Sequence, residues 1–223
     1  MKQHAAPRAV IWDMDGTLID SGDYHWRAWD RQMTAEGAPI SYEQFVATFG
    51  QRNDTILRGW LGDDLADAEM ARISAAKEAL YRAMLAEYGI ELLPGNRAWL
   101  ERLQAEGWRQ AIASAAPRAN IEAILGVLEL EGIFDTIVAA EDVLRGKPDP
   151  QVFLLAAERL GVPPAQCIVV EDAPAGVEAA RRAGMRSIGV GPKYAVLPAD
   201  RVVMRLDALP DDTFDRLLDQ PGA

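Results

Sequence analysis

The sequence predicts an α/β protein with a doubly wound parallel sheet and an inserted segment made only of helices. From residue 95 onward, short apolar runs alternate with amphipathic stretches. The apolar runs lack a polar residue at every second position, which is typical of parallel strands buried on both faces. Between about residues 23 and 89 the pattern is helical throughout, with no clear strand. The helical segment therefore interrupts the α/β part.

The first expected strand is the apolar run AVIW at residues 9–12, and carboxylates follow it at once. Asp13 and Asp15 stand in the segment DMDGTLID. Carboxylates two residues apart on a strand point to opposite faces, so they can meet only where the backbone turns. Gly16 permits such a turn. The segment is suited to aim two carboxylates at one site, although a solvated acidic turn is the alternative.

Four helices are expected next, and they predict a separate domain. Their sequences are YHWRAWDRQMTAEG, SYEQFVATFG, DTILRGWLG and DAEMARISAAKEALYRAMLAEYG. Glycine and proline near residues 21–22 and 93–95 can act as hinges. We expect a core domain of residues 1–20 and 94–223 and a helical cap domain of residues 21–93. The cap would cover the carboxyl end of the first strand.

Later strands also end in polar side chains. Ser114 follows the strand RQAIA, and Glu171 and Asp172 follow CIVV. Lys147 stands in GKPDP, after the strand near FDTIVAA. Ligands of doubly wound sheets bind outside the carboxyl ends of the strands, so these groups are expected to meet. Several carboxylates in a small volume favour a hard cation such as Mg²⁺, while a lysine and a hydroxyl suit phosphate oxygens.

Four segments in this order resemble the motifs of the haloacid dehalogenase superfamily. They are DMDGTLID, Ser114, GKPDP and VVEDAPAGVEAARRAG. The resemblance spans nearly the whole chain, and the position of the helical insert is similar to the subgroup with a helical cap. It implies a Rossmann-like core and an aspartyl-phosphate intermediate. An Asp at position 15, rather than the Tyr or Ala of dehalogenase and phosphonate-cleaving relatives, favours phosphate esters as substrates.

The resemblance also implies a role for each motif residue. Asp13 would be the nucleophile and Asp15 the general acid and base. Lys147 would steady the nucleophile and the developing charge, and would contact the phosphoryl group together with Thr17 and Ser114. A Mg²⁺ ion would be held by the following residues: Asp13, the carbonyl of Asp15, Asp172, and Glu171 directly or through water.

Three cap residues are expected to contact the substrate: His25, Arg52 and Lys77. The segments DYHWRAW and FGQRNDTIL resemble the beta-phosphoglucomutase branch, in which a His follows the first motif and an Arg binds a second phosphate. The segment AAPRAN after Ser114 departs from the pattern of that branch, although Arg118 or Asn120 could substitute. For Lys77, a solvated surface position is the alternative.

The resulting hypothesis is a Mg²⁺-dependent phosphohydrolase for a small phosphorylated metabolite, with a sugar phosphate as one candidate. The alternative is beta-phosphoglucomutase, in which a sugar hydroxyl rather than water attacks the aspartyl-phosphate. A non-catalytic metabolite-binding protein is a third hypothesis, and a missing nucleophile or metal-binding Asp would favour it. Neither residue is missing.

Composition and net charge limit the kinds of molecule that the protein is expected to bind. The net charge of -11 over 223 residues opposes binding to nucleic acid or to an anionic membrane surface. With a single cysteine, Cys167, no disulfide within the chain is possible, and we expect that thiol to be buried. No apolar run resembles a signal peptide or a membrane span. We therefore expect a cytoplasmic protein that acts as a monomer on a small phosphorylated substrate.

Overall fold

The computed structural model describes residues 7–219 and contains one six-stranded sheet, which confirms the predicted α/β class. All neighbouring strands pair in parallel, in the order β3-β2-β1-β4-β5-β6. The strands are β1 Ala9–Trp12, β2 Arg109–Ala113, β3 Thr136–Val138, β4 Cys167–Glu171, β5 Arg186–Gly189 and β6 Arg201–Val202. The first five match the predicted strands, and β6 was not predicted.

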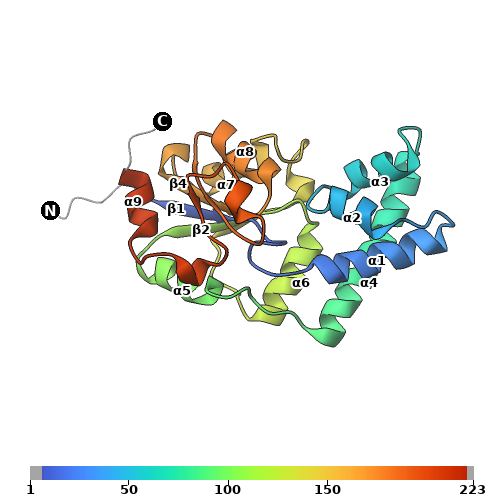
Figure 1. Cartoon of the computed structure of the whole chain (residues 1–223), viewed down its shortest axis with the longest axis horizontal. Helices are drawn as coiled ribbons and strands as arrows, with labels where there is room; N and C mark the ends of the chain where they lie inside the picture. Colours follow the sequence, from blue (N-terminus) through green and yellow to red (C-terminus); the bar gives the residue numbers. More distant parts are fainter. Residues whose placement is uncertain (1–6, 220–223) are drawn as a thin grey trace.

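Helices cover both faces of the sheet, as Figure 1 shows. The helices after the cap segment are α5 Asn96–Ala105, α6 Arg118–Leu128, α7 Gln151–Leu160, α8 Pro174–Arg182 and α9 Thr213–Asp219. Short 3-10 helices lie at η1 Ala140–Asp142, η2 Pro164–Gln166, η3 Tyr194–Val196 and η4 Leu206–Ala208.

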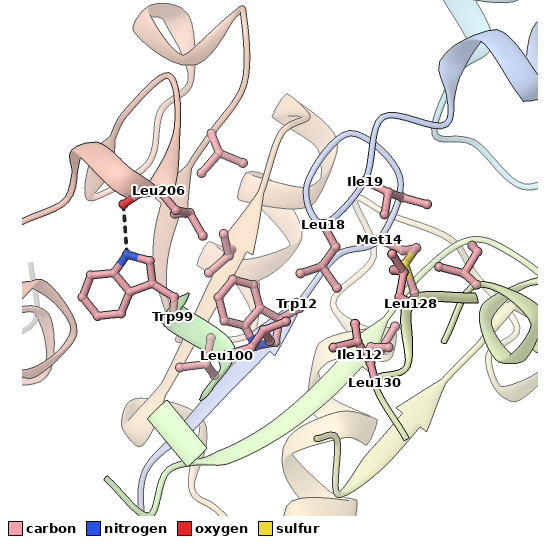
Figure 2. Close-up of a cluster of buried hydrophobic side chains, with 14 of the residues drawn as sticks. Trp12, Met14, Leu18, Ile19, Trp99, Leu100, Ile112, Leu128, Leu130 and Leu206 are labelled. Carbon is pink, nitrogen blue, oxygen red and sulfur yellow. Dashed lines mark hydrogen bonds between the residues drawn. The ribbon is translucent and has the colours of Figure 1, made fainter. Parts of the chain in front are cut away.

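Strand β1 shows why the predicted strands are apolar on both faces. Val10 and Trp12 pack into a cluster with side chains of α5, α6 and α9, whereas Ala9 and Ile11 pack against α7 and α8. All four side chains have no exposed surface. Figure 2 shows the first cluster, in which the Trp99 indole of α5 donates a hydrogen bond to the Leu206 carbonyl over 2.9 Å.

The inserted segment forms helices α1 Gly22–Ala35, α2 Tyr42–Thr48, α3 Asn53–Leu61 and α4 Asp67–Tyr88. They gather on one side of the molecule, beyond the sheet (Figure 1). Many of their apolar side chains form a third cluster, which includes Trp29, Met33, Phe45 and Leu57. Ala28, Tyr81 and Leu85 instead join the first cluster of the sheet. None of the helices within residues 7–219 is long and apolar enough to cross a membrane.

The register of the central strands fixes where the chemistry can lie. Trp12 of β1 lies level with Ile112 of β2 and with Val170 of β4. The residues directly beyond these pairs, Asp13 and Glu171, are therefore neighbours at the carboxyl edge of the sheet. The Asp13 amide extends the ladder by donating to the Val170 carbonyl over 3.0 Å.

Candidate active site

A cavity of about 320 Å³ lies between the carboxyl edge of the sheet and the inserted helices α1–α4, which are called the cap below. From the core it is lined by these predicted site residues: Asp13, Asp15, Ser114, Lys147, Glu171 and Asp172. From the cap it is lined by two of the three predicted residues, His25 and Lys77. The structure thus brings eight of the predicted side chains to one cavity.

Lys147 joins two carboxylates at the centre of the core half. Its Nζ donates to Asp13 Oδ1 over 2.5 Å and to Glu171 Oε1 over 2.7 Å. All three side chains are at most about one-tenth exposed. The second Glu171 oxygen accepts from the Ala173 amide over 2.7 Å, so both oxygens of this carboxylate are hydrogen-bonded.

Negative charge exceeds positive charge around Lys147. Burial raises the pKa of Asp13 well above its ordinary value, and the neighbouring Glu171 and Asp172 carboxylates add to that rise against the opposing effect of Lys147. Burial and the Glu171 carboxylate raise the pKa of Asp172 to about 7. Two carboxyl groups that resist ionisation side by side indicate that the site needs a further positive charge.

The residues present fit a hard divalent cation. Oxygen atoms of Asp13, Glu171 and Asp172 lie within 4.8 Å of one another. An all-oxygen set of carboxylates is the kind of ligand that Mg²⁺ takes. Two glycines make room for the set. A Cβ at Gly16 would stand 2.3 Å from Asp172 Oδ2, and one at Gly176 would stand 1.8 Å from Glu171 Oε1.

Asp15 has partners of its own, distinct from those of Asp13. Its Oδ1 accepts a hydrogen bond from Ser21 Oγ over 2.5 Å and lies 3.3 Å from His25 Nε2. Burial alone would raise the pKa of Asp15, but the hydrogen bonds from His25 and Ser21 outweigh burial and hold that pKa below its ordinary value. The two aspartates of the first motif are therefore set in different surroundings.

Lys77 is buried in the cap and orients His25. The ammonium nitrogen of Lys77 lies 2.8 Å from His25 Nδ1. An ammonium can only donate, so Nδ1 accepts and the ring proton is left on Nε2, which faces Asp15. The imidazole also stacks on the Tyr81 ring, with the centroids 4.2 Å apart. Lys77 is 1% exposed, which excludes the solvated position considered for it.

Glu78 connects two cap helices to the core. Its Oε1 accepts from Lys77 Nζ over 2.9 Å and from Asn53 Nδ2 over 2.7 Å. Its Oε2 accepts from Asn120 Nδ2 over 2.5 Å, and Asn120 lies in the first turn of the core helix α6. The Asn120 Oδ1 atom in turn accepts from the guanidinium of Arg82 in α4 over 2.8 Å. Glu78 lines the cavity and is 4% exposed.

Two predicted site residues lie outside the cavity lining. The Arg52 guanidinium turns toward the core, where its Nη1 donates to the carbonyls of Ala140 over 2.5 Å and Val143 over 3.0 Å. Thr17 is buried, and its hydroxyl has no hydrogen-bond partner within residues 7–219. Arg118, considered as a substitute phosphate contact, pairs with Asp142 instead.

Few features of the sequence mark the residues that support the site. Ser21 and Tyr81 were not among the predicted site residues, although both contact the Asp15–His25 pair. The adjacent Lys77 and Glu78 lie in a 22-residue helix in which charged residues are frequent, so nothing in the local pattern marks them as buried. Gly176 could have been noticed only once its close approach to Glu171 was known.

Comparisons with known proteins agree with this geometry. A family model described as haloacid dehalogenase-like hydrolase matches residues 7–184. A beta-phosphoglucomutase of Bacillus subtilis is 33% identical over 91% of this chain and 91% of its own length. A fructose-1-phosphate phosphatase of Escherichia coli is 34% identical over 81% of this chain and 95% of its own length.

Solved structures of similar enzymes share this fold. The crystal structure of a beta-phosphoglucomutase from Clostridium difficile superposes with a TM-score of 0.84 and 28% identity, over 96% of this chain and 97% of that one. The fold and the site define a doubly wound α/β core that gathers carboxylates and a lysine at the carboxyl edge of its sheet. The chain belongs to the haloacid dehalogenase-like hydrolase family.

Proposed function

We propose that the protein is a Mg²⁺-dependent phosphatase that hydrolyses a small phosphorylated metabolite, a sugar phosphate among the candidates, through an aspartyl-phosphate on Asp13. The observation that carries the proposal is the division between the two aspartates. Asp13 lies 2.5 Å from the Lys147 ammonium, whereas Asp15 is held by Ser21 and His25. A nucleophile and a separate proton carrier are what transfer of a phosphoryl group through the enzyme requires.

In the first half-reaction, an Asp13 oxygen forms a bond to phosphorus while the bond between phosphorus and the leaving oxygen breaks. Asp15, whose low pKa makes it a carboxylate in the free protein, must take up a proton when the ester binds. It then gives that proton to the leaving oxygen, so the alcohol leaves neutral. His25, with its Nε2 3.3 Å from Asp15, orients this carboxyl group. Lys147 offsets the negative charge that gathers on the phosphoryl oxygens, and Ser114 at the cavity wall supplies a hydroxyl donor to them.

In the second half-reaction, water attacks the phosphorus of the aspartyl-phosphate. Asp15, now a carboxylate, takes a proton from that water, and the acyl-phosphate bond breaks to release inorganic phosphate and the Asp13 carboxylate. Asp15 thereby returns to its protonated form for the next turnover. Thr17 remains part of the proposed phosphoryl contacts, because its buried hydroxyl lacks a partner within the described chain.

Mg²⁺ would be held by carboxylates of Asp13, Glu171 and Asp172, with the carbonyl of Asp15 as a further proposed ligand. When bound, it would neutralise charge on the phosphoryl group and on these carboxylates. The cap, proposed as a domain of residues 21–93 inserted into a core of residues 1–20 and 94–223, would exclude bulk water. The extreme ends of that core lie outside the described residues.

Beta-phosphoglucomutase is the second candidate, supported by the 33% identical Bacillus subtilis relative. Both activities share the first half-reaction and differ in whether water or a sugar hydroxyl attacks the aspartyl-phosphate. Incubation with beta-glucose 1-phosphate, Mg²⁺ and a trace of glucose 1,6-bisphosphate distinguishes them. We expect free phosphate and glucose. Glucose 6-phosphate without free phosphate would reject the phosphatase in favour of the mutase.

A further inference from the structure

The cap half of the cavity carries charges that cancel. Among the described residues that line the cavity, the titratable side chains from helices α1–α4 are His25, Lys77 and Glu78. Lys77 and Glu78 form an ion pair of 2.9 Å, with side-chain exposures of 1% and 6%. His25 accepts from Lys77 through Nδ1, so its ring carries a proton on Nε2 alone. The positive charge of Lys77 is therefore neutralised within the protein, by the Glu78 carboxylate.

The carboxylate of Glu78 is fixed in this position. It accepts from Lys77, from Asn53 over 2.7 Å and from Asn120 over 2.5 Å. These three donors come from two cap helices and from the core. A buried carboxylate held by three donors does not swing away when a ligand enters, because each lost hydrogen bond would have to be replaced.

The arginine that could have supplied a free positive charge is engaged elsewhere. Arg52 does not line the cavity, and its Nη1 donates to the Ala140 and Val143 carbonyls of the core. In the core half, the charge of Lys147 is shared between Asp13 and Glu171. No unmatched cation therefore faces the cap half of the cavity among the residues that the structure describes.

We infer that the cap half selects phosphomonoesters whose leaving group is neutral and hydroxylated, and that Glu78 discriminates against substrates with a second phosphate. This inference rests on the proposed function and narrows its substrate class. A second phosphate would bring further negative charge next to the Lys77–Glu78 pair, and Glu78 already neutralises the ammonium of that pair. No free positive charge would then offset the added negative charge, which is unfavourable. The neutral amides of Gln51 and Asn53, which line the same half, suit hydroxyl groups.

The test compares substrates that share a reacting group and differ in the distal one. Phosphate release is measured for fructose 1-phosphate and fructose 1,6-bisphosphate, and for the 1-phosphate and 1,6-bisphosphate of beta-glucose, all with Mg²⁺ and with the release from position 1 identified by product analysis. We expect kcat/KM for each monophosphate to exceed that for its bisphosphate by about tenfold or more. Equal efficiency, or a preference for the bisphosphate, would overturn the inference.

Glu78→Gln removes the negative charge and keeps the shape of the side chain. The ratio of kcat/KM for monophosphate over bisphosphate is expected to fall by about tenfold. Glu87→Gln is the matched control, because Glu87 lies exposed on the same helix and the net charge changes equally. Both substrates are assayed on one preparation, so partial unfolding does not alter the ratio. An unchanged ratio in Glu78→Gln would overturn the role of Glu78.

Asn53→Lys keeps the inference testable if Glu78→Gln does not fold. It places a cation beside Glu78 at the start of α3, where Asn53 is only half-buried. The ratio should again shift toward the bisphosphate, and an unchanged ratio counts against the inference. Failure of the proposed function looks different, since no ester, including a simple aryl phosphate, would then release phosphate from the wild-type protein.

Discussion

The two halves of the cavity are held in place in different ways. In the core half, Asp13 and Glu171 directly follow paired residues of β1 and β4, so the register of the sheet positions them. In the cap half, His25, Lys77 and Glu78 come from α1 and α4, and hydrogen bonds between side chains position them. The backbone thus fixes the groups proposed to react, while side-chain contacts fix the groups proposed to select the substrate. Substitutions in the core half should slow all substrates, and those in the cap half should change their relative rates.

The strongest test of the core half is Asp13→Asn. The amide cannot form the aspartyl-phosphate, so kcat should fall by about 10⁴-fold or more for every substrate. The measurement is phosphate release from an aryl phosphate and from a sugar phosphate. Asp20→Asn is the control, because Asp20 belongs to the same motif yet is exposed, and it should change kcat little. Turnover near the wild-type rate in Asp13→Asn would show that another group is the nucleophile.

Asp15→Asn tests the proton carrier, and its effect should depend on the leaving group. For a sugar phosphate, kcat is expected to fall by about 10²- to 10⁴-fold, the usual contribution of general acid catalysis. For 4-nitrophenyl phosphate the loss should be smaller in the first half-reaction, since nitrophenolate leaves without a proton. Single-turnover measurements of nitrophenolate release separate that half-reaction from hydrolysis. An equal loss for both esters in this measurement would contradict the assignment of Asp15 as general acid.

The core half is also where the sequence was most informative. Apolar runs buried on both faces predicted five of the strands, and the polar residues that end them lie in one cavity. The reason is that residues at the carboxyl ends of parallel strands must share an edge, whatever the helices do. Strand β6, with only Arg201 and Val202, and helix α9, with seven residues, carry too short a pattern to be recognised.

The cap half could be predicted only in part. His25 and Lys77 line the cavity, but the same sequence pattern left a solvated surface open for Lys77. The position of that side chain depends on the adjacent Glu78, which is itself held by Asn53 and Asn120 from other elements. Arg52 is predicted to contact the substrate, and in the structure without substrate its guanidinium contacts backbone carbonyls of the core. Contacts between helices that are far apart in the sequence produce no periodic pattern in the local sequence, so they could not be predicted from it.

A substitution at the proposed metal site should have an effect of intermediate size. Asp172→Asn should raise the Mg²⁺ concentration needed for half-maximal activity by about tenfold or more, given that even outer partners of a metal site contribute 10- to 100-fold. Chelation with EDTA should abolish wild-type activity, and added Mg²⁺ should restore it. Thermal unfolding gives a second readout, because Mg²⁺ that binds the folded state should raise the Tm of the wild type more than that of Asp172→Asn. The same Mg²⁺ dependence in both proteins would remove Asp172 from the metal site.

The smallest expected effect concerns Arg52, which joins the two halves. Its Nη1 donates hydrogen bonds to the Ala140 and Val143 carbonyls, in the segment that leads to Lys147. The Arg52 side chain also packs against Gly146, where a Cβ would stand 3.0 Å from Arg52 Cδ. Arg52→Ala should loosen both the cap and this loop. Two hydrogen bonds at the lower end of the ordinary net strength, about 0.5 kcal/mol each, correspond to a fall in kcat/KM of about fivefold.

The way that this loss is distributed over substrates decides what Arg52 does. If it joins cap and core, kcat/KM should fall by a similar factor for an aryl phosphate, a sugar monophosphate and a sugar bisphosphate. If it instead contacts a second phosphate once the substrate is bound, only the bisphosphate should be affected. Arg58→Ala is the matched control, since Arg58 lies on the same helix and its contacts, to Asp63 and Asp67, stay within the cap. A loss confined to the bisphosphate would place Arg52 with the substrate contacts, and it would weaken the case that the cap half lacks a free cation.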